Sequence, residues 1–285
     1  MRSEEFQTEL DAILNFHDSI VKELEINSEL ISGYESQKTQ FIAATKEIPS
    51  ETYDREYDKI IPFGELLSTS LLEAFLSSQN ILSEWLDVRN IIKTNSTHRC
   101  ADVDWEQSAI HAKVLKEHLY EEKTFQIVTQ GFIGMNESGH TTTLGREGSD
   151  YSAAILAYLV DAKDVTIWKD VPGMLNADPK WFNNTVKVDQ ISYREAIELS
   201  YYGASVIHPK TIQPLQNKKI PLFIRSFLDV NTQGTVIQES MVNDDLVPMY
   251  IFKPNQILVS ISSKDFSFII EENLGEIFRL IAQSG

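Results

Sequence analysis

The chain has 285 residues, a formal net charge of −17, 42% hydrophobic residues and one cysteine. The acidic balance argues against a nucleic-acid-binding protein, because no basic face is available to follow a phosphate backbone. A single cysteine excludes a disulfide framework within the chain, which suits a reducing cytoplasm. The first residues lack the apolar core of a secretory signal, and no run of about 18 apolar residues is present, so we expect no membrane-spanning helix. We expect Cys100 to be a buried, small hydrophobic side chain.

The N-terminal part of the chain has the pattern of helices. Apolar residues recur at helical spacing through residues 1–60, and again through 63–80. Residues 83–94 resemble a short strand and the turn that leaves it. This region therefore predicts a helical segment that leads into the first strands of a sheet.

From about residue 125 strands and helices alternate. We expect strands at 125–134, 164–168, 220–227 and 257–263, and helices at 151–160, 192–203, 208–216 and 272–283. Ser192 and Glu195 form a capping box, Gly203 is placed to end that helix, and Pro209 opens the next one. The alternation predicts an α/β fold with a largely parallel sheet. A polar, acidic linker at 238–248 predicts two domains, 1–237 and 238–285.

A glycine-rich loop precedes the helix expected at 151–160. Five of the 12 glycines lie between Gly131 and Gly148. The helix that begins near Ser149 directs its free N–H groups into this loop, which makes an anion site, and Arg146 adds a bidentate donor. Asp150 either orients a metal ion or a lysine beside the anion, or only caps the helix. The loop is not a Walker-type loop, since no G-x-x-x-x-G-K-[ST] is present.

A second polar segment follows the strand expected at 164–168. Ligands of open α/β sheets bind at the carboxyl ends of strands, where this segment lies. Lys169, Asp170, Asp178 and Lys180 could bracket a nucleotide there. The alternative is an ordinary surface turn.

Several segments, in order and at matching spacing, resemble the aspartate kinase family. They are FGELLSTSLL, GFIGMNESGHTTTLGREGSDYSAA, IWKDVPGMLNADPK, ISYREAIELSYYGASVIHPKTI and IPLFIRSFLDVNTQGTVI. The resemblance implies an amino-acid-kinase (carbamate-kinase-like) fold. It also implies transfer of the ATP γ-phosphoryl group to the side-chain carboxylate of L-aspartate, with Mg²⁺, as the first step toward lysine, threonine and methionine.

The same resemblance implies roles for individual residues. Asp150 would lie at the phosphates and organise a catalytic lysine, Arg146 would hold a substrate carboxylate, and Glu65 would hold the substrate ammonium. Glu65 has a second interpretation, as a surface glutamate at the start of a helix, and we expect His208 to be structural. The remaining implied residues are Ser149, Phe132 and Thr143 around the aspartate, and Lys169, Asp170, Lys180, Gly148 and Ser205 along ATP; none is a metal ligand.

The sequence departs from the family pattern mainly on the nucleotide side. Lys169, Leu175, Lys180 and Ser205 each stand where family members often carry another residue. The family also opens with a strand ending in Lys-Phe-Gly-Gly-Thr-Ser, whose lysine neutralises the transferred phosphoryl group. We expect that strand upstream in the natural protein. With Lys169 and Lys180 expected on the outer side of the nucleotide, we expect little activity from these 285 residues alone.

The last residues, 257–285, resemble the first strand and helix of an ACT domain, a small βαββαβ regulatory module. A complete module would pair two chains into a homodimer and would bind lysine or threonine as a feedback inhibitor. Whether a homoserine dehydrogenase domain follows stays open. Two other functions are considered: an amino-acid kinase with a different acceptor, against which the segment around Arg146 argues, and a non-catalytic amino-acid-binding relative that associates with a full-length kinase.

Overall fold

The computed structural model describes residues 4–121, 126–202, 206–239, 247–252, 254–255, 257, 260–261 and 271–283. The chain divides into two compact units, Met1–Ile251 and Phe252–Gly285. The first unit continues past the boundary expected at residue 237. Val247 and Met249 pack against its core, and the Tyr250 N–H donates to the Asn176 carbonyl over 2.7 Å.

In the second unit the structure describes one helix, α9 (Glu271–Gln283), where the sequence predicts a helix at 272–283. The strand expected at 257–263 falls largely outside the described residues. The ACT-like resemblance of this part of the chain therefore stays a prediction.

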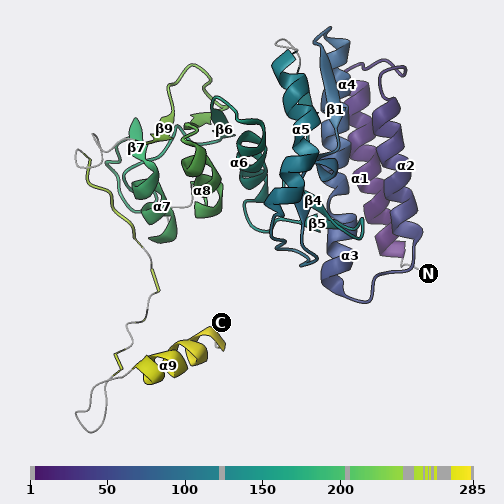
Figure 1. Ribbon diagram of the computed structural model, residues 1–285. Coiled ribbons are helices and arrows are strands. Elements are labelled where there is room, and N and C mark those ends of the chain that lie inside the picture. Colours follow the sequence, from purple (N-terminus) through teal and green to yellow (C-terminus); the bar gives the residue numbers. More distant parts are fainter. Residues whose placement is uncertain are drawn as a thin grey trace. The chain divides into compact units, whose positions relative to one another are not determined.

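Helices build the first half of the larger unit, as the apolar spacing predicts (Figure 1). Their buried faces share one core, in which Tyr34, Leu66, Leu67 and Ile92 are fully buried. The helices are α1 (Glu4–Glu23), α2 (Ser32–Lys46), α3 (Tyr53–Ile60), α4 (Phe63–Ser78) and α5 (Trp105–Glu121). Residues 53–78, α3 and α4 together, are long and apolar enough to cross a membrane. Because α4 buries Leu66, Leu67 and Leu71 in the core of the first five helices, we interpret this segment as part of the core.

The described residues form three sheets in place of one continuous sheet. The first pairs β1 (Ser83–Leu86) with β3 (Gln126–Thr129), and the second has the order β2 (Lys93–Thr94), β4 (Ile133–Asn136), β5 (Thr141–Thr143). The third has the order β6 (Val165–Lys169), β8 (Leu222–Ser226), β9 (Thr235–Gln238), β7 (Gln190–Ser192). All pairings are parallel except β4–β5 and β8–β9, so the largely parallel character is confirmed.

Two helix starts follow the capping predictions. α7 (Tyr193–Tyr202) begins where the Ser192 hydroxyl accepts from the Glu195 N–H over 3.1 Å. α8 (Pro209–Lys218) begins at His208, whose Nδ1 accepts from the Lys210 N–H over 3.1 Å. This bond confirms the structural interpretation of His208. Gly203 lies outside the described residues.

The helix α6 (Gly148–Val160) separates two hydrophobic cores. Ala154 and Ala157 pack into the core formed by α7, α8 and the third sheet, while Ile155 and Leu159 pack into the core of the first five helices. α6 contacts both α5 and α8 (Figure 1). The N-terminal end of α6 therefore lies where both halves of the unit can supply side chains.

The prediction that Cys100 is buried is wrong, because its side chain is exposed. It follows Arg99, whose left-handed backbone (φ 64°) turns the chain between β2 and α5. The Lys210 ammonium lies 3.8 Å from its sulfur. A turn position on the surface explains why this small apolar residue does not enter either core.

Candidate functional site

The glycine-rich loop packs a tight turn against the first turn of α6. A Cβ atom on Gly148 would lie 2.6 Å from the Phe132 Cβ, and one on Gly131 would lie 2.7 Å from the Ser149 hydroxyl oxygen. The Phe132 N–H donates to the Ser152 hydroxyl over 2.9 Å. Larger residues would separate the two segments, so these glycines are needed for close approach. The structure thus brings Phe132, Gly148 and Ser149 together.

The Thr143 side chain is held by a hydrogen bond to a buried carboxylate. Its hydroxyl donates to Asp58 over 2.8 Å, and Asp58 has no exposed surface. Asp58 also accepts from the Arg99 N–H at 3.0 Å and contacts the His98 Nδ1 at 2.9 Å. The sequence analysis missed Asp58, which stands 85 positions from Thr143. No local pattern could have joined them.

Glu65 lies in the first turn of α4 and is partly exposed. Its carbonyl accepts from the Thr69 hydroxyl over 2.6 Å, and that hydroxyl accepts from the Gln130 side chain over 3.0 Å. Gln130 directly precedes Gly131. The start of α4 is therefore tied to the turn that carries Phe132, on the side where the sequence predicts the aspartate pocket.

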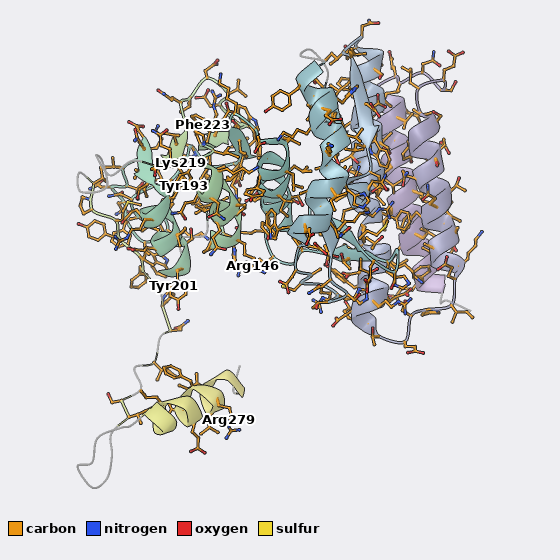
Figure 2. The ribbon with its side chains drawn as sticks, in the orientation of Figure 1. Arg146, Tyr193, Tyr201, Lys219, Phe223 and Arg279 are labelled. Carbon is orange, nitrogen blue, oxygen red and sulfur yellow. The ribbon has the colours of Figure 1, made fainter. Side chains whose placement is uncertain are left out.

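Arg146 and Ser149 are both exposed, and Arg146 lies on the outside of the loop that leads into α6 (Figure 2). Glu147 between Arg146 and Gly148 is the N-cap residue, with a left-handed backbone (φ 54°) and no side-chain cap hydrogen bond. One of its carboxylate oxygens is buried without a hydrogen-bond partner. The helix N-terminus, its free N–H groups and an exposed guanidinium thus face the same solvent region, which suits an anionic ligand.

Asp150 forms an ion pair with Lys169. The Lys169 Nζ lies 2.9 Å from the Asp150 Oδ2, with side-chain exposures of 22% and 18%. Asp150 lies inside α6, and the N-cap is Glu147, so Asp150 does not have the capping role that was the alternative. Lys169 was expected on the outer side of the nucleotide. The structure places it beside the first turn of α6, because β6 ends there.

The polar segment after β6 is held by Asn176 in its middle. The Asn176 side chain accepts from the Val186 N–H at 2.8 Å and donates to the Pro248 carbonyl at 3.3 Å. Asp170 and Lys180 are exposed on this segment, and Leu175 is partly exposed. The Lys180 N–H donates to Asp178 over 2.8 Å. Ser205 lies outside the described residues.

A magnesium ion that arrives with a nucleotide would need few ligands from the protein. Among the described residues, no group of three or more His, Cys, Asp or Glu side chains could hold a metal ion. Mg²⁺ is usually bound through one or two carboxylates, water and substrate phosphates, without an all-protein cage. Asp150, whose side chain is 18% exposed in the first turn of α6, is a carboxylate of the kind that could serve such an ion.

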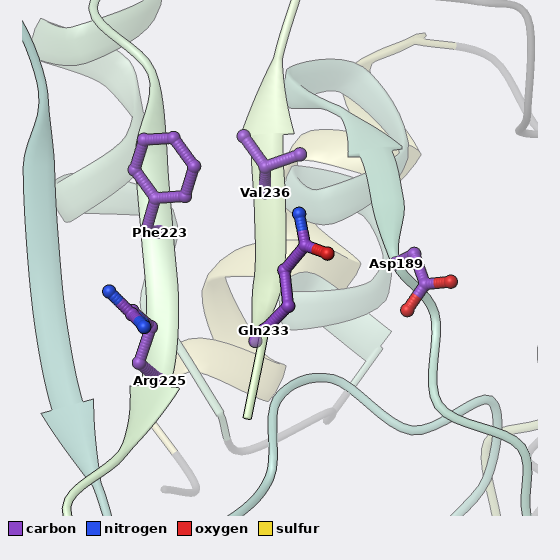
Figure 3. Close-up of a pocket in the computed structure, with 6 residues that line it drawn as sticks. Asp189, Phe223, Arg225, Gln233 and Val236 are labelled. Carbon is purple, nitrogen blue, oxygen red and sulfur yellow. The ribbon is translucent and has the colours of Figure 1, made fainter. Parts of the chain in front are cut away.

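A separate pocket of about 270 Å³ opens on the third sheet (Figure 3). Its lining residues are Asp189, Phe223, Arg225, Gln233, Gly234 and Val236. Along β8, Leu222 and Ile224 are buried in the core, so Phe223 and Arg225 point to the opposite face. None of the residues predicted for the site lines this pocket.

The family model and the similar proteins both point to amino acid kinases. Residues 12–226 match the model of the amino acid kinase family. The chain is 33% identical over 275 residues to lysine-sensitive aspartokinase 3 of Escherichia coli (strain K12), and the alignment covers 96% of this chain and 60% of that protein. The chain thus spans about three-fifths of the length of this curated relative.

Two crystal structures of E. coli aspartokinase III are similar to this chain. One is a complex with aspartate and ADP (R-state), with a TM-score of 0.76, and the other a complex with lysine and aspartate (T-state), with a TM-score of 0.75. Each is 33% identical and covers 85% of this chain and 54% of the solved chain.

Proposed function

The chain belongs to the amino acid kinase family, and from that premise we propose that it acts as an aspartate kinase. One observation carries the proposal. The segment from Thr141 to Asp150, which resembles aspartate kinases in sequence, forms a closely packed turn and a helix N-terminus, with Arg146 and Ser149 exposed to solvent. The 33% identity to an aspartokinase supports the same acceptor.

In the proposed reaction a side-chain carboxylate oxygen of L-aspartate attacks the γ-phosphorus of ATP. The bond from that phosphorus to the β,γ-bridging oxygen breaks, and its electron pair leaves on ADP. The products are 4-phospho-L-aspartate and ADP. Such a transfer depends mainly on positioning and on neutralising charge.

The acceptor side would use groups from the start of α4, from the turn before β4 and from β5 and the loop that leads into α6. The planar fork of Arg146 would bind a carboxylate of aspartate in a bidentate way, and Glu65 would bind its ammonium. Phe132, Thr143 and Ser149 would shape the pocket. Since Asp58 holds Thr143 in a buried network, this pocket needs little rearrangement when aspartate binds.

The nucleotide side would use the N-terminal end of α6 and the segment after β6. The Gly148 N–H donates to the Gly145 carbonyl, so the free N–H groups of Ser149 and Asp150 would face the phosphates, with Asp150 organising a lysine. Asp170, Lys180 and Ser205 would lie along the rest of ATP. Mg²⁺ bound with the nucleotide would neutralise phosphate charge.

We also propose how the protein is regulated and assembled. We propose lysine as a feedback inhibitor, because aspartokinase III of E. coli has been solved with lysine and aspartate. Threonine stays a second candidate. We also propose a homodimer formed through a C-terminal ACT-like region, and a cytoplasmic location, which the single exposed thiol suits.

The test is formation of the acyl phosphate. The protein, with ATP, Mg²⁺ and L-aspartate, should release ADP and form a product that hydroxylamine traps as the aspartyl hydroxamate. Glutamate and N-acetylglutamate serve as control acceptors, and turnover with either in place of aspartate would favour another amino-acid kinase. Calorimetric binding of aspartate without any binding of ATP would favour the non-catalytic relative.

A further inference from the structure

We propose that the pocket of about 270 Å³ on the third sheet is a binding site for a small carboxylate with an apolar body, and that Arg225 binds its carboxylate group (Figure 3). This inference does not depend on the proposed function, because none of the residues predicted for the kinase site lines the pocket. Two observations carry it: an arginine nitrogen that is buried without a hydrogen-bond partner, and an open space beside that arginine which no side chain fills.

Gly234 keeps the space beside Arg225 open. It lines the pocket, precedes β9 directly and carries no side chain. A Cβ atom at Gly234 would overlap the Ile224 carbonyl oxygen and would lie 3.0 Å from the Arg225 Cα, so another residue does not fit there without a shift of the backbone. The close approach of β8 and the start of β9 therefore makes one wall of the pocket from backbone alone.

The apolar part of the pocket comes from β8 and β9. Phe223 and Val236 are partners in the antiparallel register of these strands and lie side by side (Figure 3). Both side chains are partly exposed, whereas Ile237, which follows Val236, is buried in the core on the other face. An aliphatic or aromatic group that covered Phe223 and Val236 would remove apolar surface from water.

Arg225 supplies the charge. Its guanidinium lies over the ring of Trp168, its register partner on β6, at 5.1 Å from the ring centroid. One terminal nitrogen donates to the Val230 carbonyl over 3.2 Å, but the Nε is buried and has no hydrogen-bond partner. Asp229, the acid beside Val230, accepts from the Thr232 hydroxyl of its own turn. A stacked guanidinium with unused N–H groups is arranged to bind a carboxylate through two hydrogen bonds.

The other charges around the pocket leave Arg225 uncompensated. Asp189 is the one acid among the six described residues that line the pocket, and it forms an ion pair with Lys187 at 2.5 Å. The Lys187 ammonium also donates to the carbonyls of Gln233 at 2.6 Å and Gly234 at 3.2 Å, on the side of the pocket away from Arg225 (Figure 3). Since Asp189 and Lys187 neutralise each other, one positive charge remains, which suits a monocarboxylate better than a doubly charged phosphate.

The experiment measures the binding of 4-methylpentanoate by calorimetry. Pockets for drug-sized ligands hold about 300–1,000 Å³, so a short branched acid is a suitable probe for this smaller pocket. The wild-type chain should bind it with a dissociation constant of about 1 mM. Two relatives of the probe separate its parts: 4-methylpentanamide lacks the charge and acetate lacks the apolar body. Each should bind about tenfold more weakly or worse.

Two substitutions in the pocket have matched controls outside it. Arg225→Met should weaken the binding of 4-methylpentanoate about tenfold or more, and Phe223→Ala about fivefold. Arg194, which is 79% exposed on α7, and Phe16, which is 63% exposed on α1, lie outside the pocket. Arg194→Met and Phe16→Ala should each change the affinity by less than about twofold.

Equal affinities for 4-methylpentanoate and 4-methylpentanamide would overturn the inference, and so would equal effects of Arg225→Met and Arg194→Met. Displacement of the acid by ADP with Mg²⁺ would also overturn it, because the pocket would then belong to the nucleotide site. If Arg225→Met does not fold, ¹H–¹⁵N spectra of the wild-type chain decide: the Arg225 Nε–Hε resonance should shift with the acid and not with the amide. If neither method detects binding, the inference fails and the proposed kinase function is unaffected.

Discussion

The two sides of the α6 N-terminus are built in different ways. On the acceptor side, Thr143 and Asp58 are buried and joined by hydrogen bonds, and the Gly131 turn packs directly on α6. On the nucleotide side, Asp170 and Lys180 are exposed on an irregular segment. A buried network cannot lose a member without cost to folding, whereas exposed charges can change with little effect on stability. For the proposed function, we infer from this comparison a preformed acceptor pocket and a nucleotide site that depends on a few charges.

The largest effect is expected at the base of the acceptor side. Asp58→Ala removes the acceptor of Thr143 and of the Arg99 N–H in a fully buried position. We expect a loss of about 3 kcal/mol in the free energy of unfolding, measured by urea denaturation. Asp54→Ala on the same helix is the control, because Asp54 is 55% exposed and its pair with Arg99 should contribute less than about 1 kcal/mol. Equal losses for the two variants would contradict a preformed pocket.

The next largest effect is expected on kcat, from a substitution at Asp150 that should leave the fold intact. Asp150→Ala should lower kcat about 10²-fold, because the proposed function places this carboxylate at the phosphates, where it organises a lysine. Steady-state kinetics would measure it. Asp161→Ala at the other end of α6 removes a surface partner of Lys116 and Lys218 and should leave kcat unchanged. A normal kcat in Asp150→Ala, with a lower melting temperature, would mean that the ion pair is only structural.

A smaller effect tests which ligand Arg146 binds. Arg146→Lys keeps the charge and loses the planar fork, so the KM for aspartate should rise about tenfold. The KM for ATP should change by less than about twofold. Equal shifts in the two KM values would assign Arg146 to a phosphate and move it from the acceptor side to the nucleotide side.

The smallest effect is expected on stability, from a substitution at Glu147, the N-cap residue of α6. Glu147 has a φ of 54° and a buried carboxylate oxygen without a partner. Glu147→Gly should raise the free energy of unfolding by about 1 kcal/mol, measured by thermal denaturation, because glycine adopts this backbone without strain. Lys219→Gly, at a φ of 57° and exposed, should gain less, since it removes no buried charge. A destabilised Glu147→Gly would show that the carboxylate has a favourable role in the unliganded protein.

The sequence predicted what depends on local pattern and missed what depends on distant contacts. Helical spacing predicted α4, the alternation of strands and helices predicted α6, and the glycine cluster predicted a loop that leads into α6. The ion pair of Lys169 was not predicted, because it depends on where β6 ends relative to α6. Asp58 was missed for the same reason, since its partners become neighbours only when α3, β5 and the 98–99 turn pack together. The exposure of Cys100 depends on the left-handed turn at Arg99, which composition does not reveal.

The hydrogen bonds of Asn176 limit how the segment after β6 can move. Its backbone and side chain hold residues 248–250, and the rings of Phe182 and Tyr250 stack at 5.9 Å. The segment after β6 is therefore tethered at its middle, and it cannot swing outward as a flap hinged at its two ends. To open, it must release the stretch of chain that leaves the first unit at Ile251. A force applied to the chain at that exit would therefore act on the segment after β6 through the contacts of residues 248–250, and the segment and this stretch of chain should move together.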